Sequence, residues 1–367
     1  MPIVVQMLSK ALKTLKRLPS DSHTLKSASL KEAFPAASQQ LLLDSEEVPT
    51  PETRDMSFSK FHTYHDTPHH QTRRVYAALL DDVRFCPTNN VITTPNRSLV
   101  RESAGPGPIE FGVDKQAIAT AEEVDSIKGI CTAFRCSFHG YYHFLIDNLS
   151  RFDLLNESVF SGYDEINLLC PGGLGPVEEY FVSKVCPPNV SVVSLDESGL
   201  YRAEKYLFLS FPTRCGSAYI PGPYIDRLRS RTLQSTSQKR NRRLYISRRR
   251  ASERRLQNED ALMDQLRSLG FRRHDLETYS PTKQIRLFQE AECIVAPHGA
   301  GLANLLFSTN ATVLELQASH TVAPHFYFLC KRMGHTYTYL THRAPDEDDD
   351  FITDPELVAN RVASLLR

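Results

Sequence analysis

The 367-residue chain has no net charge, because 43 lysines and arginines balance 43 aspartates and glutamates. A protein whose whole surface binds nucleic acid needs a basic excess, so this balance argues against that class. The sequence also shows no signal peptide and no apolar run long enough to span a membrane. We therefore expect a protein that is cytoplasmic or peripheral to a membrane. The lumen of the secretory pathway stays an alternative, since there are five Asn-x-Ser/Thr sequons, at Asn96, Asn148, Asn156, Asn189 and Asn310.

The eight cysteines form no CxxC pair and no Cys/His spacing of a zinc site. We expect them to be mostly buried free thiols. The acidic run at residues 346–350 contains Asp-x-Asp spacings like those that hold manganese in other transferases, but no strand is expected before it. We interpret this run as solvated and predict no metal ligand.

Surface-to-volume scaling predicts two domains with a cleft between them for a chain of this length. Hydrophobic residues make up 41% of the chain and charged residues 23%, which are ordinary globular values. We predict an α/β protein of four segments: an amphipathic N-terminal helix and linker (1–60), an N-terminal α/β lobe (61–235), a C-terminal Rossmann-like lobe (236–345), and an acidic linker with a C-terminal helix (346–367).

The first of these segments begins with a helical pattern at residues 4–18. Apolar side chains share one face and basic side chains the other, as in a helix that lies on an anionic membrane. We expect peripheral membrane contact there. The alternative is a helix that packs on its own domain or is frayed.

The two lobes follow from alternating apolar runs and helical stretches, which are typical of βα units and predict parallel sheets covered by helices. The expected strands of the N-terminal lobe are at 166–169, 190–195 and 206–211. In the C-terminal lobe we expect strands at 243–247, 293–296 and 312–316, and helices at 258–269, 281–290, 301–307 and 354–366.

A strand-to-helix turn at residues 298–302 is the sharpest local motif. Its sequence is His298-Gly299-Ala300-Gly301-Leu302, directly after an apolar strand. Glycines let the backbone turn tightly and leave helix amides free, so such a turn can bind a phosphate. A purely structural turn, with His298 as a structural histidine, is the alternative.

Two arginines follow the expected strand at 243–247. Guanidinium groups match phosphate oxygens bidentately, so Arg248 and Arg249 would meet the turn at residues 298–302 on one anion, a diphosphate. We interpret the neighbouring Arg250, Arg254 and Arg255 as a solvated or ion-paired face.

Glu315 lies within an otherwise apolar strand, where an unpartnered carboxylate would be costly. It could accept hydrogen bonds from ribose hydroxyls, as acidic residues do in dinucleotide folds. A structural ion pair is the alternative.

Three residues of the N-terminal lobe have helical spacing. His139, His143 and Asp147 stand at i, i+4 and i+8, so one helix would stack them on one face. A histidine beside a carboxylate is a ready general base, and we assign His143 and Asp147 to catalysis. A helix cap with a core histidine is the alternative, and it is the main interpretation of His139.

Together these motifs resemble glycosyltransferase family 61, which includes O-linked N-acetylglucosamine transferases, plant xylan transferases and bacterial capsular polysaccharide proteins. The similar pieces span residues 136–340 and include Tyr142-His143-Phe144 with Asp147, Tyr245-Ile246-Ser247-Arg248-Arg249, Asn258-Glu259, Gln284-Ile285 with Phe288 and Ala291, the turn at 298–302 with Asn304, and Glu315. The chain departs from the family pattern at Phe144 and Ser150, where the family often has Trp and Pro.

The resemblance implies a GT-B fold, with two Rossmann-like lobes facing across a cleft, and an inverting hexosyl- or pentosyltransferase. It implies a nucleotide-sugar donor, usually a UDP-sugar, bound mainly by the C-terminal lobe, with the N-terminal lobe for the acceptor. The acceptor, a glycan, lipid or protein, stays open because residues 1–130 match nothing in the family. The donor-site residues are then Arg248, Arg249, His298, Gly299, Ala300, Gly301, Leu302, Asn304 and Glu315.

Inversion needs one in-line displacement, in which a base takes the acceptor proton while cations or amides stabilise the leaving diphosphate. Arginine and amide charge can replace a metal, so we expect no required cofactor. One alternative is a sugar-nucleotide isomerase, hydrolase or binding module of the same fold. Another is a nucleic-acid-binding protein that uses the basic run at residues 239–255, although that run has few aromatic residues.

Overall fold

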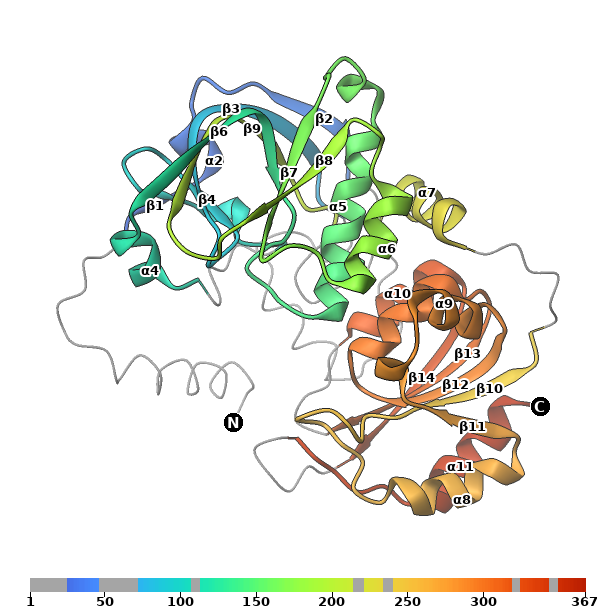
Figure 1. Ribbon diagram of the computed structural model, residues 1–367. Coiled ribbons are helices and arrows are strands. Elements are labelled where there is room, and N and C mark those ends of the chain that lie inside the picture. Colours follow the sequence, from blue (N-terminus) through green and yellow to red (C-terminus); the bar gives the residue numbers. More distant parts are fainter. Residues whose placement is uncertain are drawn as a thin grey trace. The chain divides into compact units, whose positions relative to one another are not determined.

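The computed structural model describes residues 25–45, 72–106, 113–213, 221–233, 240–318, 324–342 and 349–367. They divide into a first unit, within Asp21–Val48 and His70–Thr232, and a second unit, within Leu233–Arg367 (Figure 1). The helix expected at residues 4–18 lies outside these ranges. In the described part of the chain, no helix has the length and apolarity needed to cross a membrane.

The first unit is built on a nine-stranded mixed sheet of order β1-β5-β4-β3-β9-β6-β7-β8, with β2 paired to β3. Its strands are β1 (Ser27–Ala28), β2 (Gln39–Leu43), β3 (Val75–Cys86), β4 (Val91–Thr93), β5 (Leu99–Val100), β6 (Glu123–Ala133), β7 (Ile166–Pro171), β8 (Val190–Leu195) and β9 (Leu200–Leu209). The strands β9, β6, β7 and β8 are parallel. However, β3 runs antiparallel to β2, β4 and β9. The expected Rossmann-like character is therefore limited to one half of this sheet.

The helices of the first unit are α2 (Leu30–Ala33), α4 (Lys115–Thr120), α5 (Leu149–Asp153), α6 (Pro176–Val185) and α7 (Gly222–Thr232), and a π-helix, η3 (His143–Asn148), precedes α5. Three elements, β1, α2 and β2, come from the segment that we expected to be a linker. Leu30 explains this difference, since its side chain is buried in the core of the sheet. Its amide donates to the Glu102 carboxylate at 2.9 Å.

The second unit has a five-stranded parallel sheet of order β11-β10-β12-β13-β14, which confirms the parallel sheet expected here. The strands are β10 (Arg242–Ile246), β11 (Phe271–His274), β12 (Ala291–Pro297), β13 (Thr312–Ala318) and β14 (Thr336–His342). The helices are α8 (Glu259–Ser268), α9 (Pro281–Gln289), α10 (His325–Met333) and α11 (Pro355–Leu365), with the 3-10 helix η7 (Ala300–Phe307).

Helices cover both faces of this second sheet, with α8 and α11 on one side and α9 and α10 on the other (Figure 1). Side chains that alternate along the strands, such as Tyr245, Val295 and Leu314, pack into the core on the α8 and α11 side. The chain passes from β11 on one side of β10 to β12 on its other side. In open α/β sheets, ligands bind at the carboxyl ends of the strands at such a reversal of strand order.

The C-terminal helix that we expected is present as α11, with Asp354 as its N-cap. The acidic run was expected to be solvated, but its last residue, Asp350, is 3% exposed. The Asp350 carboxylate accepts from the backbone amide and from the guanidinium of Arg255. A buried carboxylate needs such a partner. The seven cysteines in the described ranges are free, and six of them are buried.

Candidate functional site

The turn after β12 places glycine where a side chain has no room. Gly299 has φ 173° and ψ 168°, which is extended backbone open to any residue. A Cβ atom there would lie 1.8 Å from Nη1 and 2.6 Å from Cζ of Arg248. A side chain at residue 299 would therefore displace the Arg248 guanidinium.

Arg248 follows β10 and brings its guanidinium to this turn. Its Nη2 donates to the carbonyl oxygen of Glu253 at 2.9 Å. Its Nε is buried and has no acceptor among the described residues. Burial and the nearby charge of Arg254 lower the pKa of Arg248 to about 10. A partly buried cation with unfilled donors is suited to an anionic ligand.

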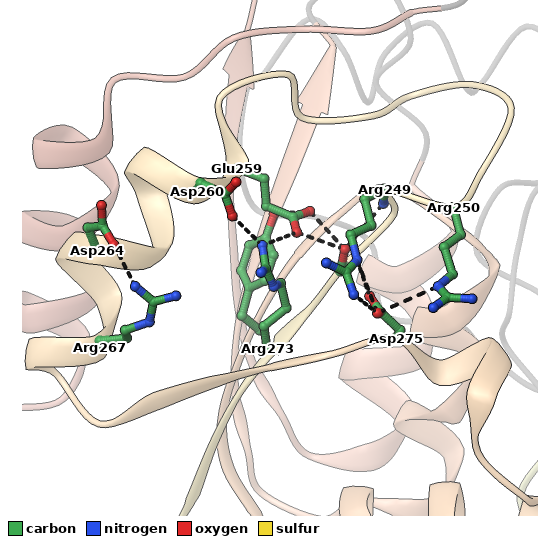
Figure 2. Close-up of polar contacts among 10 residues, drawn as sticks. Arg249, Arg250, Glu259, Asp260, Asp264, Arg267, Arg273 and Asp275 are labelled. Carbon is green, nitrogen blue, oxygen red and sulfur yellow. Dashed lines mark hydrogen bonds and ion pairs between the residues drawn. The ribbon is translucent and has the colours of Figure 1, made fainter.

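Arg249 points to the other side of β10. Its Nε lies 3.0 Å from both carboxylate oxygens of Asp275, which follows β11, and Arg250 Nε lies 3.6 Å from Asp275 (Figure 2). The hydrogen bond to Asp275 raises the pKa of Arg249. The structure therefore brings Arg248, but not Arg249, to the turn at residues 298–302.

A charged network supports the loop that carries both arginines. Ser247 Oγ donates to the two carboxylate oxygens of Glu259 at 2.8 and 2.9 Å, and it accepts from the amide of Arg249 at 3.2 Å. Arg273 bridges Glu259 and Asp260 at 3.2 and 2.6 Å (Figure 2). Glu259 is 5% exposed, so these bonds fix the exit of β10.

The expected ion-paired face is found at the remaining arginines of this stretch. Arg254 pairs with Glu253 at 2.6 Å, and Arg255 pairs with Asp350 at 2.6 Å.

His298 belongs to a second buried network. Its Nδ1 lies 2.6 Å from Oε1 of Glu315, whose side chain is fully buried. The other oxygen of Glu315 accepts from Tyr337 Oη and from Gln317 Nε2, the latter at 3.0 Å. Three side chains already hydrogen-bond to the Glu315 carboxylate. Its placement therefore favours the ion-pair alternative over a ribose contact. Neither Tyr337 nor Gln317 was identified from the sequence.

The start of η7 is held by packing and by one buried amide. A Cβ atom on Gly301 would lie 3.1 Å from Leu276 Cδ1, so the turn is packed closely. Asn304 is fully buried and donates to Gly301 O and to Gln284 Oε1, both at 3.1 Å. Leu302 is buried, whereas Ala300 is partly exposed. The first amides of a helix have no partner within it, and here they lie in the same turn as Gly299.

The pair His143 and Asp147 forms as predicted, on the π-helix η3. His143 Nδ1 lies 2.7 Å from Asp147 Oδ2, and Thr213 Oγ1 donates to the other oxygen. Asp147 is 1% exposed, while the His143 side chain is 30% exposed. The imidazole stacks on Phe138 at a centroid distance of 5.1 Å.

His139 does not join this pair, so the predicted stack of three residues is wrong. It is exposed and precedes the helix, because the chain turns at Gly140 with φ 104°. Sequence spacing missed Thr213, which follows β9. Since His143 follows β6 and these strands are parallel neighbours, their carboxyl ends meet at one edge.

The carboxylate beside each histidine determines which ring nitrogen carries the proton. A carboxylate that accepts from Nδ1–H leaves Nε2 of a neutral imidazole as the proton acceptor. The contact with Asp147 therefore leaves Nε2 of His143 as the nitrogen that could accept a proton. Within the described ranges, no group of three or more His, Cys, Asp or Glu side chains could hold a metal ion.

The chain was compared with known protein families and with curated proteins. The family model described as Glycosyltransferase 61 matches residues 141–314. This range includes the pair His143 and Asp147, Arg248, and the turn at residues 298–302, and it ends one residue before Glu315. No curated protein matches the chain.

Proposed function

We propose that this chain, whose residues 141–314 match the model of glycosyltransferase family 61, moves a sugar, with inversion, from a nucleotide-sugar donor to a hydroxyl group of a glycan, lipid or protein. The observation that carries the donor site is the guanidinium of Arg248, which lies on Gly299 with a buried Nε that has no described acceptor. An anion at this point would pair with that guanidinium. A UDP-sugar is the donor that we propose, and its diphosphate is that anion.

The reaction in this proposal is a single displacement at the anomeric carbon of the donor. The acceptor oxygen forms the new bond while the bond to the diphosphate breaks on the opposite face. The acceptor proton moves to His143 Nε2, and Asp147 stabilises the resulting imidazolium. Arg248 and the first amides of η7 take up the charge of the departing diphosphate.

The first and second units act in this proposal as the acceptor and donor lobes of a GT-B enzyme. Because arginine and amide groups neutralise the diphosphate, transfer does not require a divalent ion. Turnover that persists in excess EDTA supports the proposal that arginine and amide groups, rather than a metal ion, neutralise the diphosphate. Turnover that stops in EDTA and returns with Mn²⁺ contradicts it.

The donor is identified by thermal-shift measurements with UDP, GDP, CDP and their sugars, since a ligand that binds the folded state raises the melting temperature. We expect UDP and one UDP-sugar to give the largest shifts. NMR of the product then gives the anomeric configuration, which we expect to be opposite to that of the donor. Retention of configuration, or a preference for another nucleotide, contradicts the proposal.

A further inference from the structure

The buried pair His298 and Glu315 has the same arrangement as the pair His143 and Asp147. In both pairs, Nδ1 of the imidazole faces a carboxylate, at 2.6 Å in the first case and 2.7 Å in the second. Each carboxylate is at most 1% exposed and accepts from a hydroxyl group, of Tyr337 or of Thr213. The second unit therefore holds its own oriented histidine.

The partners of Glu315 determine where the proton of His298 is. Tyr337 Oη and Gln317 Nε2 are both donors toward Oε2, so Glu315 is used only as an acceptor. Its Oε1 then accepts from Nδ1–H of His298. Nε2 is left for a ligand.

The position of His298 places this nitrogen at the donor site. His298 directly precedes Gly299, the residue against which Arg248 lies. Its backbone amide is fixed by the carbonyl oxygen of Leu316 at 2.8 Å, and its side chain is 11% exposed. The ring is flanked by Phe326 at a centroid distance of 5.4 Å. Both the backbone and the ring are thus held in one orientation.

A purely structural role would not need this network. Burying a carboxylate is costly even when it is paired, and apolar residues of similar size often replace such pairs without loss of stability. Here four polar side chains share one buried cluster next to an anion-binding arginine. The cost of burying these polar groups is explained if the orientation of His298 matters for a ligand.

We propose that Tyr337 and Gln317 are positioning residues: they hold Glu315, which fixes His298 as the Nδ1–H tautomer so that Nε2 accepts a hydrogen bond from a hydroxyl group of the bound donor. This inference rests on the proposed function. Removing the Tyr337 hydroxyl takes one of two donors from Glu315 Oε2, so the position of the carboxylate, the orientation of the His298 ring and the donor affinity should change. Loss of an outer partner of a ligating histidine typically costs about 10- to 100-fold in the analogous metal sites.

The test compares Tyr337→Phe with Tyr339→Phe, a matched control on the same strand whose ring lies 6.2 Å from that of Tyr337. The ¹⁵N chemical shifts of the His298 ring report the tautomer without any ligand. We expect Tyr337→Phe to change these shifts and to weaken UDP binding about tenfold. It should raise KM for the donor while KM for the acceptor stays unchanged. Tyr339→Phe should keep the His298 ring shifts and the UDP affinity of the unmodified protein.

A second variant, Glu315→Gln, keeps the side-chain volume but can no longer act only as an acceptor. We expect it to mix the tautomers, because an amide group can donate to Nδ1 as well as accept from it. Unchanged ring shifts in both variants, or changed ring shifts with unchanged UDP affinity, overturn the inference. If the unmodified protein binds no nucleotide, the proposed function fails and with it the ligand assigned to Nε2, whereas the tautomer measurement stands by itself.

Discussion

Arg248 and Gly299 are in such close contact that a methyl group on the glycine would lie 1.8 Å from the guanidinium nitrogen Nη1. The contact joins the residues that follow β10 and β12, which are neighbouring parallel strands. The chain reverses its strand order at this point, where open α/β sheets bind ligands. A cation, a glycine-containing turn and the start of η7 thus share one position.

Gly299→Ala tests this contact. The methyl group must displace the Arg248 side chain, including Cδ at 2.9 Å, while the extended backbone of residue 299 tolerates alanine. We expect the protein to fold and its UDP affinity to fall by about tenfold or more, the scale of one charge-assisted hydrogen bond. Gly162→Ala is the control, since a Cβ atom there meets nothing within 4 Å. Wild-type UDP affinity in Gly299→Ala contradicts the site.

Arg249→Ala separates the two adjacent arginines. The Arg249 side chain is 47% exposed and pairs with Asp275, and exposed ion pairs contribute little. We expect UDP affinity, measured by calorimetry, to stay close to that of the unmodified protein. A loss as large as that of Arg248→Ala would place Arg249 at the diphosphate.

His143→Ala and Asp147→Asn test the base. General-base catalysis is worth about 10² to 10⁴ in rate, so each variant should lose turnover on that order while UDP affinity is unchanged. His139→Ala is the matched control, because His139 is exposed and lies outside η3. Transfer at the unmodified rate by a folded His143→Ala protein rejects the assignment.

His274 makes the stability of the second unit depend on pH. Burial, followed by the charges of Arg242, Lys283 and Arg272, lowers its pKa from 6.5 to about 4, while Asp275 acts in the opposite direction. Between these pH values the unfolded chain binds more protons, so the stabilisation is present above pH 6.5 and is lost as the pH falls toward 4.

His274→Gln should remove this dependence. From pH 7 to pH 5 we expect the unmodified protein to lose about 2 kcal/mol more unfolding free energy than the variant, measured with urea. His139→Gln should match the unmodified protein. Equal losses in the unmodified protein and His274→Gln would show that His274 is not held neutral by the fold.

The second unit was the more predictable part of the fold. Strands buried on both faces are continuous apolar runs, so β12 and β13 were found within about two residues of their ends. In the first unit, β3 pairs with β9 across more than a hundred residues, and no local pattern reports such a pairing. Its antiparallel half was therefore missed.

Within the site, local spacing identified the pair His143 and Asp147, because both lie on one helix. It also suggested that adjacent arginines act together. In the structure Arg248 lies against Gly299, which follows β12, whereas Arg249 pairs with Asp275, which follows β11. Thr213 and Tyr337 were missed because tertiary structure alone brings them to their carboxylates.

The central claim is that Arg248 binds the diphosphate of a nucleotide-sugar donor, and calorimetric titration of UDP into the unmodified protein and Arg248→Ala tests it most directly. We expect the unmodified protein to bind UDP and the folded variant to bind about 10- to 100-fold more weakly, a loss of about 1.5 to 3 kcal/mol. Equal affinity of both proteins for UDP, or no binding by either, would contradict the account.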